Sequence, residues 1–164
     1  MKFEEYLDRI EQKLRESFDI ERDYDLNNYG IDMFAEHHMR TEQYIITRKT
    51  VINSIETNEF CFIKYFEDID ERQVEKFTGA LIDAMDELID FEDGHMSTIM
   101  TGVMVMDSKP GAEVIKLIEK YKYQKGFAFG FKGWVDIRLI LVTMEDKYIV
   151  SNKKGKEVIE VYSI

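Results

Sequence analysis

Apolar residues recur with two different periods along this chain, and the order in which these periods alternate limits its fold more than any other feature. Helical spacing occupies three segments, whereas alternation of apolar and polar residues fills most of the rest. One helical segment precedes the strand-like segments and two interrupt them. This order predicts an α+β fold, with a largely antiparallel or mixed twisted sheet and three helices packed on one of its faces.

The expected elements follow the order of one helix, three to five strands, a helix, a strand, a helix and three to four strands. Asp70 is a good N-cap for the second helix, with Gln73 as its capping-box partner, and Thr57-Asn58 is expected to form the turn of a hairpin. The predicted helices cover 3–18, 70–90 and 111–121. The predicted strands cover 20–26, 31–39, 43–48, 50–56, 59–66, 99–106, 127–131, 134–143, 148–151 and 158–162.

Length and cysteine content place the chain among small intracellular domains. Its 164 residues suit one domain over 1–164, and the hydrophobic fraction of 45% excludes a disordered chain. The one cysteine, Cys61, cannot form an intrachain disulfide, and its apolar neighbours Phe60 and Phe62 predict a buried, unreactive thiol. The acidic N-terminus is unlike a signal peptide, and no stretch approaches the ~20 apolar residues of a membrane span. We expect a cytoplasmic protein with no membrane contact.

The charge of the chain is strongly negative and unevenly distributed. A formal net charge of −11 disfavours nucleic acid and anionic membranes as partners. Residues 109–164, however, carry eleven Lys and Arg against seven Asp and Glu, so the last third is mildly basic on an acidic body. An ordinary solvated surface accounts for this asymmetry as well as a binding surface does.

Three polar side chains of the second predicted strand are candidate metal ligands. With a period of two, Asp32, Glu36 and His38 share one face of that strand. Two carboxylates and an imidazole suit a divalent metal ion, which would make the protein a metal-dependent hydrolase. A solvated strand edge of mixed charge gives the same pattern, and we predict no cofactor beyond this metal alternative.

An aromatic block near the C-terminus is the third notable feature. Lys125, Phe127 and Phe129 would project from one face of a strand. The sequence KGFAF resembles the opening of the octapeptide of RNA-recognition motifs, which implies stacking of single-stranded RNA bases. Gly130 and Lys132 depart from that octapeptide. Aromatic side chains packed in a sheet core are the alternative interpretation.

The strand that follows combines a core face with a charged face. Trp134, Asp136 and Arg138 share one face, and the opposite face holds Val135, Ile137, Leu139 and Leu141. Charged residues in an apolar strand must be paired or hydrated. The three residues therefore form a structural ion pair, line a pocket or contact a partner chain.

Two resemblances add to this reading. The segments Glu59–Phe66 and Gly126–Val142 resemble a family of uncharacterised small acidic proteins from prokaryotes, which implies one whole domain and no assigned activity. The element order is similar to the core of the PD-(D/E)xK nuclease-like fold, which requires an acid-x-Lys triplet on its third strand. Phe62 occupies the acid position of Phe62-Ile63-Lys64, so the resemblance implies a degenerate, inactive relative.

No Gly-rich phosphate loop, nucleophile elbow or HExxH motif is present in the sequence. The leading hypothesis is therefore a non-enzymatic binding or assembly module that binds a protein partner or itself, for example as a homodimer. Small acidic secretion-type chaperones have a loosely similar element order, which implies protein clients. The metal-dependent hydrolase or degenerate nuclease and the single-stranded RNA-binding protein remain the alternatives.

Overall fold

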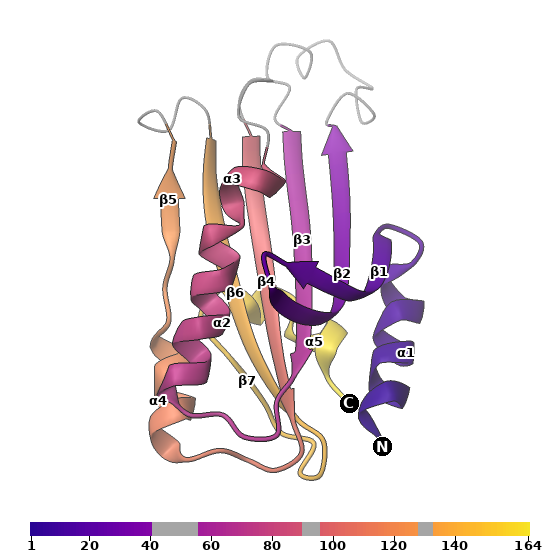
Figure 1. Cartoon of the computed structure of the whole chain (residues 1–164), viewed down its shortest axis with the longest axis vertical. Helices are drawn as coiled ribbons and strands as arrows, with labels where there is room; N and C mark the ends of the chain where they lie inside the picture. The colour runs from indigo at the N-terminus through magenta and orange to yellow at the C-terminus, as the bar shows by residue number, and fades with distance from the viewer. Residues whose placement is uncertain (41–55, 90–95, 128–132) are drawn as a thin grey trace.

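A mixed sheet of seven strands runs through the protein (Figure 1). The computed structural model describes residues 1–40, 56–89, 96–127 and 133–164. The spatial order is β1-β2-β3-β4-β6-β5, and β7 also pairs with β6. The strands β1 to β3 form an antiparallel meander, β3, β4 and β6 are parallel, and β5 and β7 run antiparallel to β6. The strands are β1 (Asp19–Leu26), β2 (Tyr29–Arg40), β3 (Glu56–Tyr65), β4 (Met96–Met106), β5 (Gln124–Gly126), β6 (Gly133–Thr143) and β7 (Ile149–Ser151).

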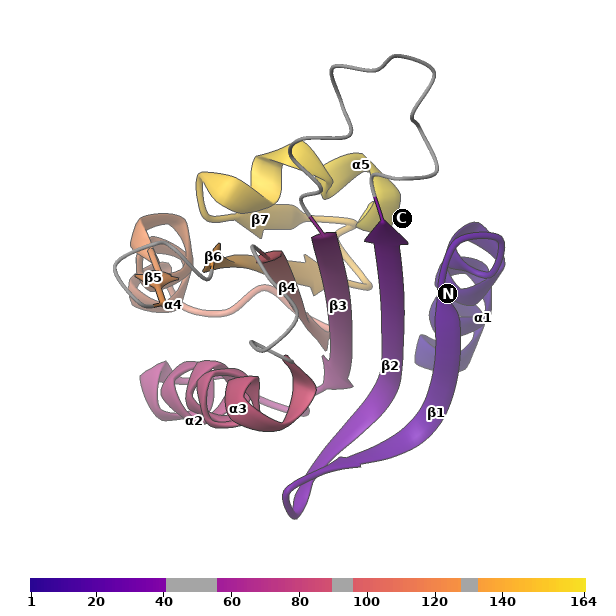
Figure 2. The ribbon, with the colours of Figure 1, turned by 90° about the horizontal axis from the view of Figure 1, so that it is seen from above.

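Helices cover both faces of the sheet (Figure 2). One face is covered by α2, α3 and α4, and the other by α1 and α5. Their bounds are α1 (Phe3–Leu14), α2 (Glu71–Asp83), α3 (Met85–Leu88), α4 (Ala112–Lys120), the 3-10 helix η3 (Lys154–Glu157) and α5 (Ile159–Tyr162). The α+β class and the mixed sheet are confirmed, whereas the prediction of helices on one face is wrong. The central strands are apolar on both sides, and parallel strands of this kind must be covered twice.

Strict alternation along the central strands divides the interior into two cores. Phe62 of β3 is fully buried in the first core with Phe77 of α2, and its neighbour Ile63 is buried in the second core with Ile10 of α1. Burial of one such side chain contributes about 1.5–3 kcal/mol before the entropy cost of ordering it. The sheet therefore depends on helices from both ends of the chain.

Two short polar segments determine where elements begin and end, and the cap at Asp70 was predicted. Asn27 and Asn28 form the tight turn between β1 and β2, both with positive φ angles (51° and 68°) that asparagine tolerates. Asp70 caps α2, because its Oδ1 accepts the backbone N–H of Gln73 at 2.9 Å. The predicted continuous helix to residue 90 is divided at Ala84, where α2 ends and the short α3 begins.

Two predicted elements are wrong. Thr57 and Asn58 do not form a turn, because both belong to β3 and are paired with β2 on one side and β4 on the other. Residues 158–162 contain the helix α5 instead of a strand, although Val158, Ile159 and Val161 favour strands. Packing of this segment on the second core overrides the local preference. The predicted strand at 43–48 and all but one end residue of those at 50–56 and 127–131 lie outside the described residues.

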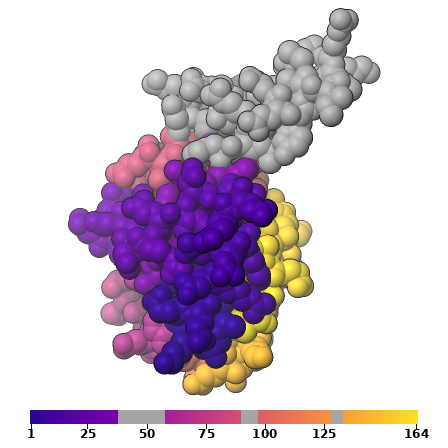
Figure 3. Space-filling view, turned by 90° about the vertical axis from the view of Figure 1, so that its right-hand side faces the viewer, coloured from indigo at the N-terminus to yellow at the C-terminus, as the bar shows by residue number. Residues whose placement is uncertain are grey.

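The N-terminal and C-terminal segments lie beside each other on the second face (Figure 3). The Tyr6 hydroxyl donates to the carbonyl oxygen of Tyr162 at 2.8 Å, and Lys13 Nζ donates to that of Val161 at 2.6 Å. Among the described residues, no helix has the length and apolar character needed to cross a membrane.

Candidate functional site

The charged face of β6 marks the polar end of the second core. As predicted, the core face of β6 is buried against the α2 side of the sheet, with Val135, Ile137, Leu139 and Leu141 in the first core. On the opposite face, Ile140 and Val142 pack into the second core, whereas Asp136 and Arg138 precede them along the strand. This face therefore changes from polar to apolar in the direction of the chain.

Arg138 is buried within a network of ion pairs. Its side chain is 7% exposed, and its Nη2 lies 2.9 Å from Glu157 Oε2 while its Nη1 lies 3.4 Å from Glu59 Oε1. Lys154 Nζ contacts the other oxygen of Glu157 at 2.9 Å. Hydrogen bonds from Lys154 and then Arg138 lower the pKa of the Glu157 carboxyl. Arg138 thus joins β3, β6 and η3, and its partners are not the neighbouring Asp136.

The outer edge of β6 is interrupted in the middle. The strand β5 pairs with residues 134–136 and β7 pairs with residues 140–142. Between them the buried side chain of Asn152 replaces a strand. Its Oδ1 accepts the backbone N–H of Leu139 at 3.0 Å, and its Nδ2 donates to the carbonyl of Ile137 at 2.9 Å. Asn152 Oδ1 also accepts the N–H of Gly155 at 2.8 Å, which fixes the start of η3.

A cleft opens at this interruption, and we call it the α4–η3 cleft. It has a volume of ≈ 510 Å³ and lies between the end of α4, the strands β5 and β6, and the β7–η3 turn. Four lysines line it against three carboxylates, one of which, Glu157, is already neutralised by Arg138 and Lys154. The charged lining residues are Glu119, Lys120, Lys122, Asp136, Lys153, Lys154 and Glu157. Of the predicted β6 group, Asp136 lines the α4–η3 cleft.

The aromatic block is divided between a strand and the first core. Lys125 lies in β5 opposite Val135, and its Nζ is 5.2 Å from the ring centroid of Phe127. Phe127 is half-buried and packs against the first core, on the side of the sheet away from Asp136. Phe129 lies outside the described residues. The predicted binding residues therefore do not form one surface, because Lys125 and Phe127 are separated by the sheet from Trp134, Asp136 and Arg138.

The candidate metal ligands on β2 do not follow a regular alternation. Ile31 and Phe34 both pack into the first core while Met33 packs into the second, so the pattern is interrupted at Asp32. Asp32 Oδ2 accepts the backbone N–H of Tyr65 at 2.7 Å. Asp32 and Glu36 therefore do not lie on the same face of β2. The side chain of His38 lies outside the described residues, and among the described ones no three His, Cys, Asp or Glu side chains are placed to share a metal ion.

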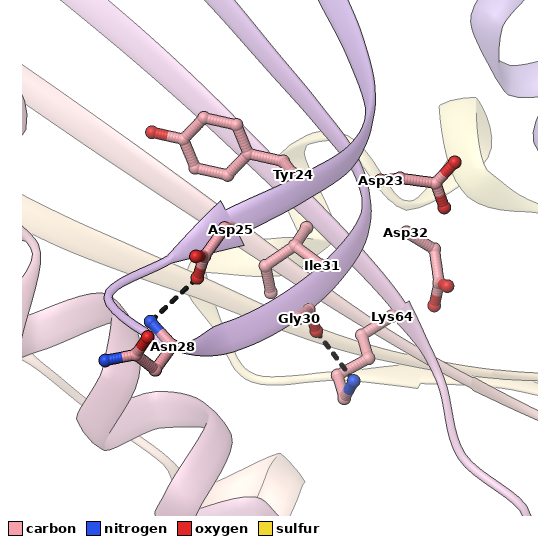
Figure 4. A pocket seen from close by; sticks show the side chains of 8 residues that line it. All are labelled: Asp23, Tyr24, Asp25, Asn28, Gly30, Ile31, Asp32 and Lys64. Carbon is pink, nitrogen blue, oxygen red and sulfur yellow. Dashed lines mark hydrogen bonds between the residues drawn. The ribbon is translucent and has the colours of Figure 1, made fainter.

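A second pocket of ≈ 460 Å³ lies at the β1–β2 hairpin and includes Asp32 (Figure 4). Lys64 Nζ donates to the carbonyl of Gly30 at 2.6 Å and lies 5.1 Å from the ring centroid of Tyr29. Asp25 Oδ1 accepts the N–H of Asn28 at 2.7 Å. These contacts stabilise the hairpin, where the strand β1 bends at Asp23 with a φ of 50°.

Cys61 is buried, as predicted. It is buried in the second core, and burial raises the pKa of its thiol to about 12. The hydroxyl of Tyr162 donates to its sulfur at 3.2 Å. A protonated thiol inside the core cannot act as a nucleophile.

The sequence reasoning missed the residues that define the α4–η3 cleft. Among them is Asn152, whose side-chain amide completes the edge of β6. The partners of Arg138 are 79 and 19 residues away in sequence, at Glu59 and Glu157. The one signal that pointed to this region is the excess of Lys and Arg after residue 109.

The fold and the cleft define an α+β protein with a mixed sheet and a charged cleft at one sheet edge. Comparison with known families finds that residues 2–164 match the family described as "Domain of unknown function (DUF8052)". The chain therefore belongs to this family, which confirms the resemblance to an uncharacterised family. No curated protein and no solved structure matches the chain.

Proposed function

We propose that this protein is a non-enzymatic binding module and that the α4–η3 cleft is its binding site. The observation that carries the proposal is the interrupted edge of β6, where three segments bring charged side chains around one cleft. Lys122 and Lys153 face this cleft from its two walls and are exposed. Within the described ranges neither makes an ion pair, so both are available to a ligand.

The composition of the surface supports polar recognition. Of the large hydrophobic side chains in the described residues, Met1 alone is exposed. A permanent hydrophobic interface needs an apolar patch, so recognition by charge and hydrogen bonds suits this surface better. We place the protein in the cytoplasm, because its acidic composition and its one buried cysteine are typical of that compartment.

The test uses three labelled eight-residue peptides of alternating sequence, Glu-Gly, Lys-Gly and Ser-Gly, and measures fluorescence anisotropy at low salt. The variant Gln124→Trp fills the cleft from β5 without changing the charge. Gln12→Trp places the same side chain at an exposed position of α1 and is the matched control. We expect saturable binding of at least one peptide that is lost in Gln124→Trp and kept in Gln12→Trp. Absence of binding by all three, or equal binding by both variants, would contradict the proposal.

The alternative functions have less support in the described residues. A nuclease-like site would use Asp32 and Lys64, which line one pocket, but Phe62 is buried in the first core where the second acid is required. For RNA stacking, the partial burial of the Phe127 ring against the first core leaves less of its face for a base. A metal-dependent hydrolase using Asp32, Glu36 and His38 would show a thermal shift with Mn²⁺ or Zn²⁺.

A further inference from the structure

We propose, on the basis of the proposed function, that the occupant of the α4–η3 cleft is an extended acidic segment of a partner polypeptide. Lysines outnumber carboxylates four to three in this cleft, with Glu119 and Asp136 as the carboxylates besides Glu157, on a chain with a net charge of −11. In the part of the chain that the structure describes, Lys120, Lys122 and Lys153 make no ion pair, whereas Lys154 is paired with Glu157. Complementary charge selects a partner that carries carboxylates.

The distribution of these lysines favours spaced charges over one compact anion. Lys120 and Lys122 belong to the wall formed by the end of α4 and the segment before β5, whereas Lys153 belongs to the opposite wall. A partner that meets both walls needs negative groups at several positions along its length. An extended acidic peptide provides this spacing, since its side chains alternate along the strand direction.

Two further groups oppose a compact anion such as a phosphate. The helix α4 ends at Lys120, so its C-terminal end borders the cleft. This end of a helix carries a partial negative charge, the reverse of the N-terminal end that binds phosphate. The carboxylate of Asp136 lines the same cleft and repels a concentrated negative charge. A polypeptide avoids these groups by placing its uncharged residues opposite them.

The test measures the affinity of the labelled Glu-Gly peptide for a charge-reversed protein. Lys122→Glu combined with Lys153→Glu is compared with Lys76→Glu combined with Lys147→Glu, which makes the same change of charge at two exposed lysines that do not line the cleft. We expect the first pair to weaken binding about tenfold, since each exposed charge pair contributes modestly and reversal adds repulsion. The first pair should also gain affinity for the Lys-Gly peptide, which a merely destabilised protein would not show.

Four outcomes would overturn the inference. Equal weakening by both pairs would mean general attraction by net charge and no site. Displacement of the peptide by tripolyphosphate, at a concentration of negative charge below that carried by the peptide, would mean that the cleft binds compact anions. A light-scattering mass above that of one chain, reduced to one chain by Lys122→Glu and Lys153→Glu, would make a second copy the occupant. Binding of the Ser-Gly or Lys-Gly peptide alone, lost in Gln124→Trp, would keep the proposed function and refute the acidic partner.

Discussion

Removal of Arg138 should lower the free energy of unfolding by more than the loss of an exposed ion pair and by less than the loss of a fully buried one. The reason is that Arg138 is buried but its partners are partly exposed. Arg138 is 7% exposed, but Glu157 and Glu59 retain 46% and 31% exposure. Exposed ion pairs contribute about 0.2–1 kcal/mol, whereas breaking a fully buried pair costs about 3–5 kcal/mol. Water can rehydrate both carboxylates once the guanidinium is gone. We therefore expect Arg138→Met, which keeps most of the aliphatic packing, to lower the free energy of unfolding by about 2 kcal/mol.

Urea denaturation followed by the fluorescence of Trp134 measures this loss. A change of about 2 kcal/mol should lower the denaturation midpoint by about 1 M at constant slope. Double-mutant cycles then separate the two partners. The coupling of Arg138 to Glu157 should exceed its coupling to Glu59, because Nε and Nη2 both donate to Glu157 and the single contact to Glu59 is 3.4 Å long. A loss below about 0.5 kcal/mol, typical of surface sites, or the reverse order of couplings would refute the reasoning.

Three further predictions concern packing, pH and the thiol. Gly102→Ala places a methyl group 2.7 Å from Phe77 Cε1 and 2.9 Å from Leu81 Cδ1, so a thermal melt should show a loss of about 1–3 kcal/mol, and a neutral effect would contradict the packing of α2 on β4. Because the folded-state pKa of Glu157 is lowered, its pairing stabilises the protein above the ordinary glutamate pKa and this contribution is lost as the pH falls through the folded value. The variant Glu157→Gln should therefore show a smaller loss of stability between neutral and acidic pH, and an unchanged pH dependence would count against the pairing. Cys61 should react with a thiol reagent only after unfolding, since its pKa is raised to about 12 by burial; rapid reaction of the native protein would contradict its placement in the core.

The parts of the fold that sequence periodicity predicted are those where one local signal dominates. The repeat of apolar residues predicted α1, and the cap at Asp70 predicted the start of α2. The alternation in 134–143 predicted both faces of β6 correctly. In each case the helical or strand period is sustained over several turns or residues, and no tertiary contact opposes it.

The failures occur where distant contacts decide the structure. The strand preference of Val158 and Ile159 is overridden because Asn152 starts η3 and Tyr162 enters the second core. The central strands β3, β4 and β6 contain continuous apolar runs, which indicate that both faces of the sheet are buried. The helices on the second face provide this cover. The prediction considered only the alternation of apolar and polar residues and therefore placed helices on one face. The interruption at Asp32 depends on the bend of β1 at Asp23, which no periodicity reveals.

The candidate site was predicted only in part for the same reason. Asp136 was selected from the sequence and lines the cleft. The cleft itself requires β5 and β7 to pair with different parts of one edge, with Asn152 between them. The residues of the cleft come from several segments between α4 and η3, so no single segment of the sequence predicts the cleft.

Backbone amide NMR during addition of the Glu-Gly peptide tests whether an acidic segment binds in the α4–η3 cleft. We expect saturable shifts confined to residues 119–124, 136–137, 152–154 and 157, which line the cleft. Shifts centred on the hairpin pocket around Asp32 and Lys64, or no shifts within the cleft residues, would contradict it.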